Sequence, residues 1–104
     1  MHIKLRSHGV DLAAVLQRHV ERRLRLVLGA SAATIREATV HLSDVNGPRG
    51  GVDQRCALHV ALAPSGTVRA EATDVDLLQA LELAAGRARR SIRREAERRQ
   101  GHAR

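Results

Sequence analysis

The 104-residue sequence predicts an α+β fold in the order β-α-β-β-β-α, with a four-stranded, mostly antiparallel sheet and two helices packed on one face. Three observations predict this fold. Four segments alternate apolar and polar residues, as strands with one buried face do. Two longer segments repeat their apolar residues at steps of three and four, as amphipathic helices do. Gly- and Pro-rich turns separate the strands, and no repeat or linker divides the chain, so we expect one domain over residues 1–104.

The first strand is expected over residues 2–6, where Ile3 and Leu5 face inward and polar residues face outward. Gly9 ends it, and Asp11 is expected to cap the helix that follows. That helix is expected to begin at Leu12 and to end near Gly29. Its apolar side consists of Leu12, Val15, Leu16, Val20, Leu24, Val27 and Leu28.

Three more strands are expected around residues 38–42, 56–62 and 68–72. A long turn over residues 44–51 joins the first two of these, and a tight turn at Pro64-Ser65-Gly66 joins the last two. The inward-facing residues are Ala38, Val40, Leu42, Cys56, Leu58, Val60, Leu62, Val68, Ala70 and Ala72.

The last element is a basic helix, expected to run from about residue 75 to residue 99 and to be followed by a short tail, 100–104. Thr73 lies three residues before Asp76, a spacing that predicts a capping box. The apolar side of the helix consists of Leu77, Leu78, Leu81, Ala84, Ala85, Ala88, Ile92 and Ala96.

Composition narrows the class of protein. The chain is 43% hydrophobic but contains no Phe, Tyr or Trp, so its core must be aliphatic and bases cannot stack on such rings. A net charge of +7 favours a polyanionic partner. The single cysteine cannot form an internal disulfide. The N-terminus lacks the apolar segment of a signal peptide, and no apolar run approaches the ~20 residues of a membrane helix, so we expect a cytoplasmic protein.

The positive charge is concentrated on the predicted helices. Residues 87–104 hold eight Arg and two Glu, a net charge of +6. Arg87, Arg90, Arg94 and Arg98 follow one another at steps of three and four, so they share one side of the second helix. Arg18, Arg22 and Arg25 do the same on the first helix, with Arg23 nearer its apolar edge. We expect the two stripes to border a basic groove that fits RNA phosphates; the alternative is a merely solubilising surface.

Other residue patterns give weaker predictions. His2, His41 and His59 fall on the open face of the sheet, where they could begin a metal site or simply be surface histidines. Cys56 is expected to be buried and structural. The turn Gly47-Pro48-Arg49-Gly50-Gly51 lacks the Lys-Ser/Thr of a phosphate-binding loop, although Arg49 could contact RNA. No cofactor site and no catalytic set stands out, so an enzyme is not expected.

The sequence resembles the ribosome hibernation-promoting factor family, also described as the ribosome-associated inhibitor or sigma-54 modulation protein family. The resemblance covers residues 2–99 and rests on three stretches, Ile3-Lys4-Leu5-Arg6-Ser7-His8-Gly9-Val10, Val20-Glu21-Arg22-Arg23-Leu24 and Glu71-Ala72-Thr73-Asp74-Val75-Asp76-Leu77-Leu78-Gln79-Ala80-Leu81-Glu82. It implies a layout similar to double-stranded-RNA-binding domains. It also implies binding to the small ribosomal subunit, at 16S rRNA in the mRNA/tRNA channel, and silencing of translation in stress or stationary phase.

The family's basic positions fall on Arg87, Arg90, Arg94 and Arg98 in the second helix and on Arg23 in the first. Another falls on Leu26, next to Arg25, and a family tyrosine is replaced by Leu78. Because the chain ends soon after the second helix, the resemblance is to the short form, which lacks a C-terminal dimerisation domain; open strand edges leave self-association possible.

The predicted function is therefore ribosome hibernation through rRNA contacts. The expected contact residues are Arg18, Arg22, Arg23, Arg25, Arg87, Arg90, Arg94 and Arg98. The alternatives are a general RNA-shape-binding protein and a regulator whose basic face meets an acidic protein partner.

Overall fold

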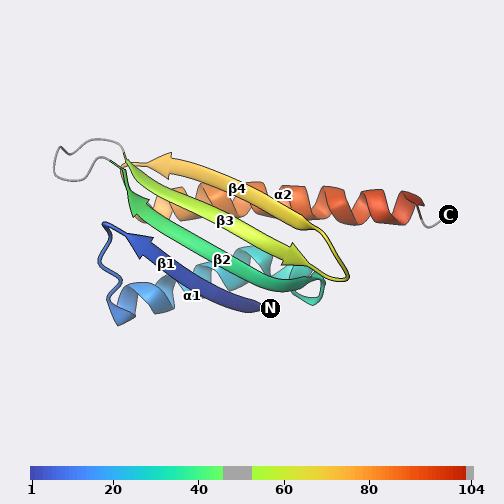
Figure 1. Ribbon diagram of the computed structural model, residues 1–104, viewed down its shortest axis with the longest axis horizontal. Coiled ribbons are helices and arrows are strands. Elements are labelled where there is room, and N and C mark those ends of the chain that lie inside the picture. The colour runs from blue at the N-terminus through green and yellow to red at the C-terminus, as the bar shows by residue number, and fades with distance from the viewer. Residues whose placement is uncertain (46–52, 103–104) are drawn as a thin grey trace.

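The computed structural model describes residues 1–45 and 53–102 and has the predicted α+β fold (Figure 1). Its strands are β1 (His2–His8), β2 (Ile35–Asp44), β3 (Gln54–Leu62) and β4 (Thr67–Asp74). Its helices are α1 (Ala14–Leu28), the 3-10 helix η1 (Gly29–Thr34) and α2 (Leu77–His102). The turn residues 47–51, with Arg49, lie outside the described residues.

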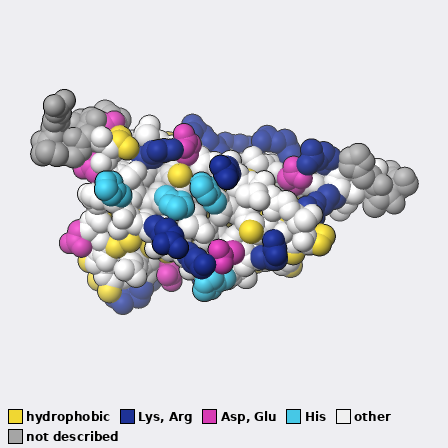
Figure 2. All heavy atoms as spheres, in the orientation of Figure 1, with side chains coloured by type: hydrophobic (Ala, Val, Ile, Leu, Met, Phe, Trp, Pro, Cys, Tyr) yellow, Lys and Arg dark blue, Asp and Glu magenta, His cyan; other side chains and the backbone are white. Residues whose placement is uncertain are grey.

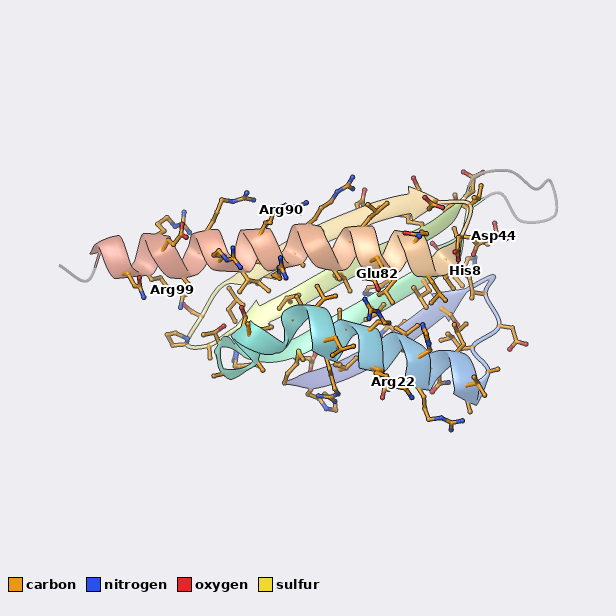
Figure 3. The ribbon with its side chains drawn as sticks, turned by 180° about the vertical axis from the view of Figure 1, so that it is seen from behind. His8, Arg22, Asp44, Glu82, Arg90 and Arg99 are labelled. Atoms are coloured by element: carbon orange, nitrogen blue, oxygen red, sulfur yellow. The ribbon has the colours of Figure 1, made fainter. Side chains whose placement is uncertain are left out.

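The four strands form one sheet in the order β1-β2-β3-β4. β1 pairs in parallel with β2, because α1 carries the chain back across the sheet, and the other pairs are antiparallel. Both helices cover one face of the sheet and leave the other face open (Figures 1 and 3). This confirms the predicted two-layer arrangement.

The core lies between the sheet and the helices and is aliphatic, as the composition requires. Its largest fully buried side chains are Leu24, Leu28, Leu42, Leu58, Leu81, Val20, Val40, Val60 and Cys56. No polar or charged residue is buried among those that the structure describes. Burial raises the pKa of the Cys56 thiol to about 12, so this cysteine is a protonated packing residue, as predicted.

The start of α1 differs from the prediction. Asp11 does not cap it: Ala13, with an extended backbone, occupies the N-cap and makes no side-chain cap bond. The first helical bond runs from the Gln17 amide to the Ala13 carbonyl (3.0 Å). Val15 is 71% exposed, although we expected it on the apolar side. It precedes the buried Val20 by five residues, and this spacing places it away from the face that Val20 and Leu24 bury.

The start of α2 also differs. Thr73 is an exposed residue of β4 and forms no capping box, because the strand continues to Asp74. Asp76 caps the helix instead: its Oδ1 accepts a bond from the Leu78 amide (3.0 Å), and its carbonyl accepts one from the Ala80 amide (3.0 Å).

α2 ends at His102, three residues later than expected. Gly101 does not stop the helix, since one glycine costs about 1 kcal/mol relative to Ala but leaves the backbone bonds intact. The last turns project past the sheet (Figure 1). Ala96, expected on the apolar side, lines an open hollow with Leu62 and Ile92 and is exposed. No helix in the described part of the chain is long and apolar enough to span a membrane.

The β3–β4 hairpin holds this outer part of α2. Its tight turn is closed by a bond from the Leu62 amide to the Gly66 carbonyl (2.9 Å), and Gly66 has a φ of +103° that favours glycine. Arg99 of α2 donates to the carbonyls of Ala63 (3.5 Å) and Ser65. A single arginine thus ties the projecting helix to the hairpin.

Candidate nucleic-acid interface

The basic residues of α1 divide between solvent and the neighbouring elements. Arg18, Arg22 and Arg25 are exposed, and Arg22 lies on the side of α1 away from α2 (Figure 3). Arg25 Nη1 lies 3.5 Å from the Met1 carbonyl, so this side chain extends toward the start of β1. The three residues therefore form a ridge on the outer side of α1 toward β1.

Arg23 points the other way, toward α2. Its Nε donates to Glu82 Oε1 at 2.5 Å, and both side chains are partly exposed. The hydrogen bond to Glu82 and then the charge of that carboxylate raise the pKa of Arg23. Figure 3 shows Glu82 between the two helices. Arg23 is thus an interhelical link that shares its charge with an acid, unlike the arginines on the outer ridge of α1.

The stripe predicted on α2 faces the edge of the sheet at β4. Arg87 Nη1 donates to the Glu71 carbonyl of β4 (2.5 Å). Arg94 and Ser91 line an open depression together with Thr67 and Arg69 of β4. The two predicted stripes therefore do not border a shared groove. That prediction is wrong because the sides of the helices that face one another are not the sides that carry the stripes. The Arg23–Glu82 pair lies at the contact between the two helices.

The remaining members of this stripe stay near the surface of α2. Arg90 is exposed, and its Nη1 lies 3.7 Å from the position that a Cβ on Gly86 would take. Arg98 is exposed and makes a two-pronged contact with Glu95, at 2.6 Å and 2.7 Å. Arg90 makes no ion pair with a described residue. It is therefore the stripe member whose charge is most available to a ligand.

Besides Arg99, which binds the hairpin, two further arginines of α2 lie outside the predicted contact set. Arg89 and Arg93 follow Glu82 by seven and eleven residues, about two and three helical turns, so they share its side of α2 and face toward α1. Both are exposed. The spacing from Glu82 could have identified them, but only the structure shows that Glu82 faces α1.

α2 therefore carries arginines on both flanks and on its outer side. We call this surface the α2 ridge, and Figure 2 shows a run of basic side chains along that edge of the molecule. Its members are Arg87, Arg89, Arg90, Arg93, Arg94 and Arg98. The ridge is a convex band of positive charge about 17 Å long, since its members span the residues from Arg87 to Arg98 at ~1.5 Å of rise each.

The open sheet face holds the predicted histidine pair. The ring centroids of His41 on β2 and His59 on β3 are 4.9 Å apart. Burial and then the charges of His59 and Arg6 lower the pKa of His41. Among the residues described, no group of three or more His, Cys, Asp or Glu side chains is placed to hold a metal ion.

Comparison with known proteins identifies the family. The family model described as "Sigma 54 modulation protein / S30EA ribosomal protein" matches residues 3–100. The chain belongs to this family. The predicted resemblance is confirmed over almost the same residues. S30EA proteins are ribosome-associated hibernation factors and not enzymes, and a ribosome-associated role follows for this member.

Solved structures similar to this S30EA protein include two from bacteria. A ribosomal subunit interface protein from Coxiella burnetii matches with a TM-score of 0.79 and 18% identity, over 93% of this chain and 99% of that one. The N-terminal domain of Thermus thermophilus Protein Y matches with a TM-score of 0.74 and 27% identity, over 90% and 98%. Among curated proteins no sequence match was found.

The structure also places two residues at which the resemblance predicts a departure from the family pattern. Leu78, at the position of the family tyrosine, is half-buried and packs against the core. Leu26, at the position of a family basic residue, is 64% exposed on α1. The first substitution keeps an apolar contact, whereas the second puts an uncharged side chain on the surface of α1.

Proposed function

We propose that this S30EA protein binds the small ribosomal subunit at 16S rRNA in the mRNA/tRNA channel and silences translation during stress or stationary phase. The observation that carries the proposal is the coincidence of the family match with the α2 ridge. One of the related structures is that of a ribosomal subunit interface protein, which supports a contact with a ribosomal subunit. Occupation of the channel by the folded domain would exclude mRNA and tRNA without any chemical step.

We expect the proposed contact residues to contribute unequally to RNA binding. Arg90 and Arg94 of the α2 ridge are exposed and make no ion pair with a described residue, so their charge is free for phosphate. Arg87 and Arg98 are exposed but already held, by the Glu71 carbonyl and by Glu95 respectively. A phosphate must compete with those partners, so we expect smaller contributions from these two.

On α1 we propose Arg18, Arg22 and Arg25 as a second group, because they form the exposed outer ridge of this helix. Arg23 is retained as a contact residue with a reduced role, because Glu82 shares its charge. With Arg23 tied to α2, this ion pair also fixes the spacing of the two basic helices. Rigid placement lowers the entropy lost when several phosphates bind at once.

The test is cosedimentation with 30S subunits. The variant R90Q/R94Q removes two free cations of the α2 ridge, and the matched control K4Q/R55Q removes two ion-paired cations from the opposite face. We expect the first to weaken 30S binding about tenfold or more and to reduce the slope of log K against log salt by about 1.4, at ~0.7 per phosphate contact. The control should bind like the native protein.

Four outcomes decide between the proposed function, its alternatives and the proposed site. Displacement by tRNA and inhibition of translation in a purified system support binding in the channel. Equal affinity for arbitrary RNA duplexes would instead favour a general RNA-shape-binding protein. No affinity for 30S subunits or for duplexes would leave an acidic protein partner, and unchanged 30S binding by R90Q/R94Q would refute the site.

A further inference from the structure

The open face of the sheet carries a row of basic side chains that crosses all four strands. Arg6 on β1 lies opposite His41 on β2, and Arg69 on β4 lies opposite His59 on β3. The two imidazoles meet between them, with ring centroids 4.9 Å apart. We call these four residues the sheet row. Figure 2 shows histidines flanked by basic side chains near the middle of this face.

The acids of this face do not neutralise the sheet row. The outward-facing acids among the described strand residues are Glu37 and Glu71. Lys4 pairs with Glu37 (Nζ to Oε2, 3.5 Å), and Arg55 pairs with Glu71. Arg6 and Arg69 are exposed and make no ion pair with any described residue. Each acid is thus taken by a cation outside the row, and the row keeps its full charge.

The shape of the face admits an extended chain. One open depression beside the row is lined by Arg6, Ser7, His8, His41 and Ser43, and another by Arg55, Ala57, His59, Arg69 and Glu71. From β1 to β4 the row spans three interstrand spacings, about 14 Å. Ala57 and Ala61 leave the surface low on either side of His59 along β3. The row therefore lies across a shallow surface that is open at both ends.

The chemistry of the row selects the ligand. Guanidinium groups bind phosphate with paired hydrogen bonds, and imidazole rings can stack on unpaired bases. Phe, Tyr and Trp are absent from the chain, so His41 and His59 offer the stacking surface in the middle of this face. An RNA duplex would present only its backbone and could not use the rings, and an acidic peptide has no flat groups for them.

We propose that the open face of the sheet binds a single strand of RNA, with Arg6 and Arg69 contacting phosphates and His41 and His59 stacking against bases. Most of this surface lies opposite the helices, and it meets the α2 ridge at β4, where Arg69 and Arg94 line one depression. The inference does not rest on the proposed function of the α2 ridge. The protein would then hold two RNA segments at once, folded rRNA on its helices and an unpaired strand on its sheet.

Protonation of His41 strengthens this site. Besides the row itself, the charged and titratable groups that face His41 and His59 are Lys4 and His8 on β1, Glu37 on β2, Arg55 on β3 and Glu71 on β4. A bound phosphate offsets the repulsion that Arg6 and His59 exert on the His41 proton. Strand binding and protonation of His41 therefore favour one another, and the affinity rises as the pH falls below the ordinary histidine pKa of about 6.5.

The experiment is fluorescence anisotropy with a labelled, unstructured RNA of about 12 nucleotides, a length within the range that single-strand-binding domains cover. The variant R6Q/R69Q removes the two arginines of the row. The control K4Q/R55Q removes the same charge from the same face but outside the row. We expect the row variant to lose about tenfold or more in affinity and the control less than about threefold, since the direct phosphate contacts are lost only in the first.

Equal losses in these two variants would overturn the proposal, because net charge alone would then explain binding. Loss of oligonucleotide binding in R90Q/R94Q but not in R6Q/R69Q would overturn it as well, because the strand would then lie on the α2 ridge. Binding of R6Q/R69Q to 30S subunits is measured in parallel. If the sheet proposal fails, the proposed function of the α2 ridge is unaffected. The proposed function of the ridge fails if R90Q/R94Q binds 30S subunits as tightly as the native protein.

A second readout addresses the histidines. Native protein is expected to bind the oligonucleotide several-fold more tightly at a pH of about 5.5 than at about 7.5, whereas H41Q/H59Q should lose most of that difference. The variant should also bind more weakly at the higher pH, because amides do not replace the rings in stacking. A variant with the native affinity and pH profile would refute the role of the pair.

Discussion

Replacement of glycine by alanine at two positions of this chain should change stability in opposite directions. At Gly66, in the β3–β4 turn, φ is +103°, and a Cβ would lie 2.9 Å from Arg99 Nη2. The backbone strain costs about 1–3 kcal/mol. At Gly86, inside α2, a Cβ would meet only Arg90 Nη1, at an ordinary 3.7 Å. Alanine there stabilises the helix by about 0.5–1 kcal/mol.

The assay is thermal unfolding followed by circular dichroism. For a domain of this size 1 kcal/mol corresponds to roughly 4–8 °C, so a G66A cost of about 2 kcal/mol lowers Tm by about 8–16 °C. G86A should raise Tm by about 2–8 °C on the same scale. The pair is matched, because each variant adds one methyl group and changes no charge.

In G66A the new Cβ must also displace the Arg99 side chain, and the loss of stability from this displacement can be separated from that of the backbone strain. In an R99A background the contact with Arg99 is gone, but the positive φ at Gly66 remains. G66A should therefore still lower Tm in that background by most of the same amount. A rise in Tm for G66A, or a fall in Tm for G86A comparable to that of G66A, would refute the reasoning from backbone conformation.

Three further predictions concern stability and binding. D76A should cost about 1 kcal/mol in urea unfolding because it removes the α2 cap, whereas D11A should change stability by less than about 0.5 kcal/mol. Since burial raises the pKa of Cys56 from 9.0 to about 12, the thiol stays protonated in the folded state after it ionises in the unfolded one. Between these pH values the free energy of unfolding should fall with rising pH, and its slope should be steeper than that of C56A by about 1.4 kcal/mol per pH unit. Equal slopes for the native protein and C56A would contradict this. R90Q alone should lower the salt slope of 30S binding by about 0.7, and an unchanged slope would exclude a phosphate contact.

The elements themselves could be predicted because their signals are local. Alternation of Val40, Leu42 and their neighbours marks a strand whose one face is buried, and this property needs no knowledge of the partner strand. The N-cap residues of the helices could not be predicted in the same way. Asp11, Thr73 and Asp76 all have side chains suited to an N-cap, and only the path of the chain into each helix decides which of them meets the first free amides.

The candidate site was predicted in part. The concentration of arginine in α2 is visible in the sequence, but the helix carries these residues on several sides. Arg87 was expected beside α1 and instead contacts Glu71 of β4, while Arg93, which was not selected, shares the side of α2 that Glu82 turns toward α1. Helical periodicity defines which residues lie together and does not define the rotation of the helix on the sheet.

The sequence by itself thus determined the order of elements, the aliphatic core, the family and the accumulation of positive charge on α2, since each depends on residue type and spacing along the chain. Only the tertiary structure decided how α2 is rotated, which cations are held by acids, and that Arg6, His41, His59 and Arg69 form one row. Those features depend on strand register and helix packing, which join residues far apart in the chain and leave no periodic signal within either segment.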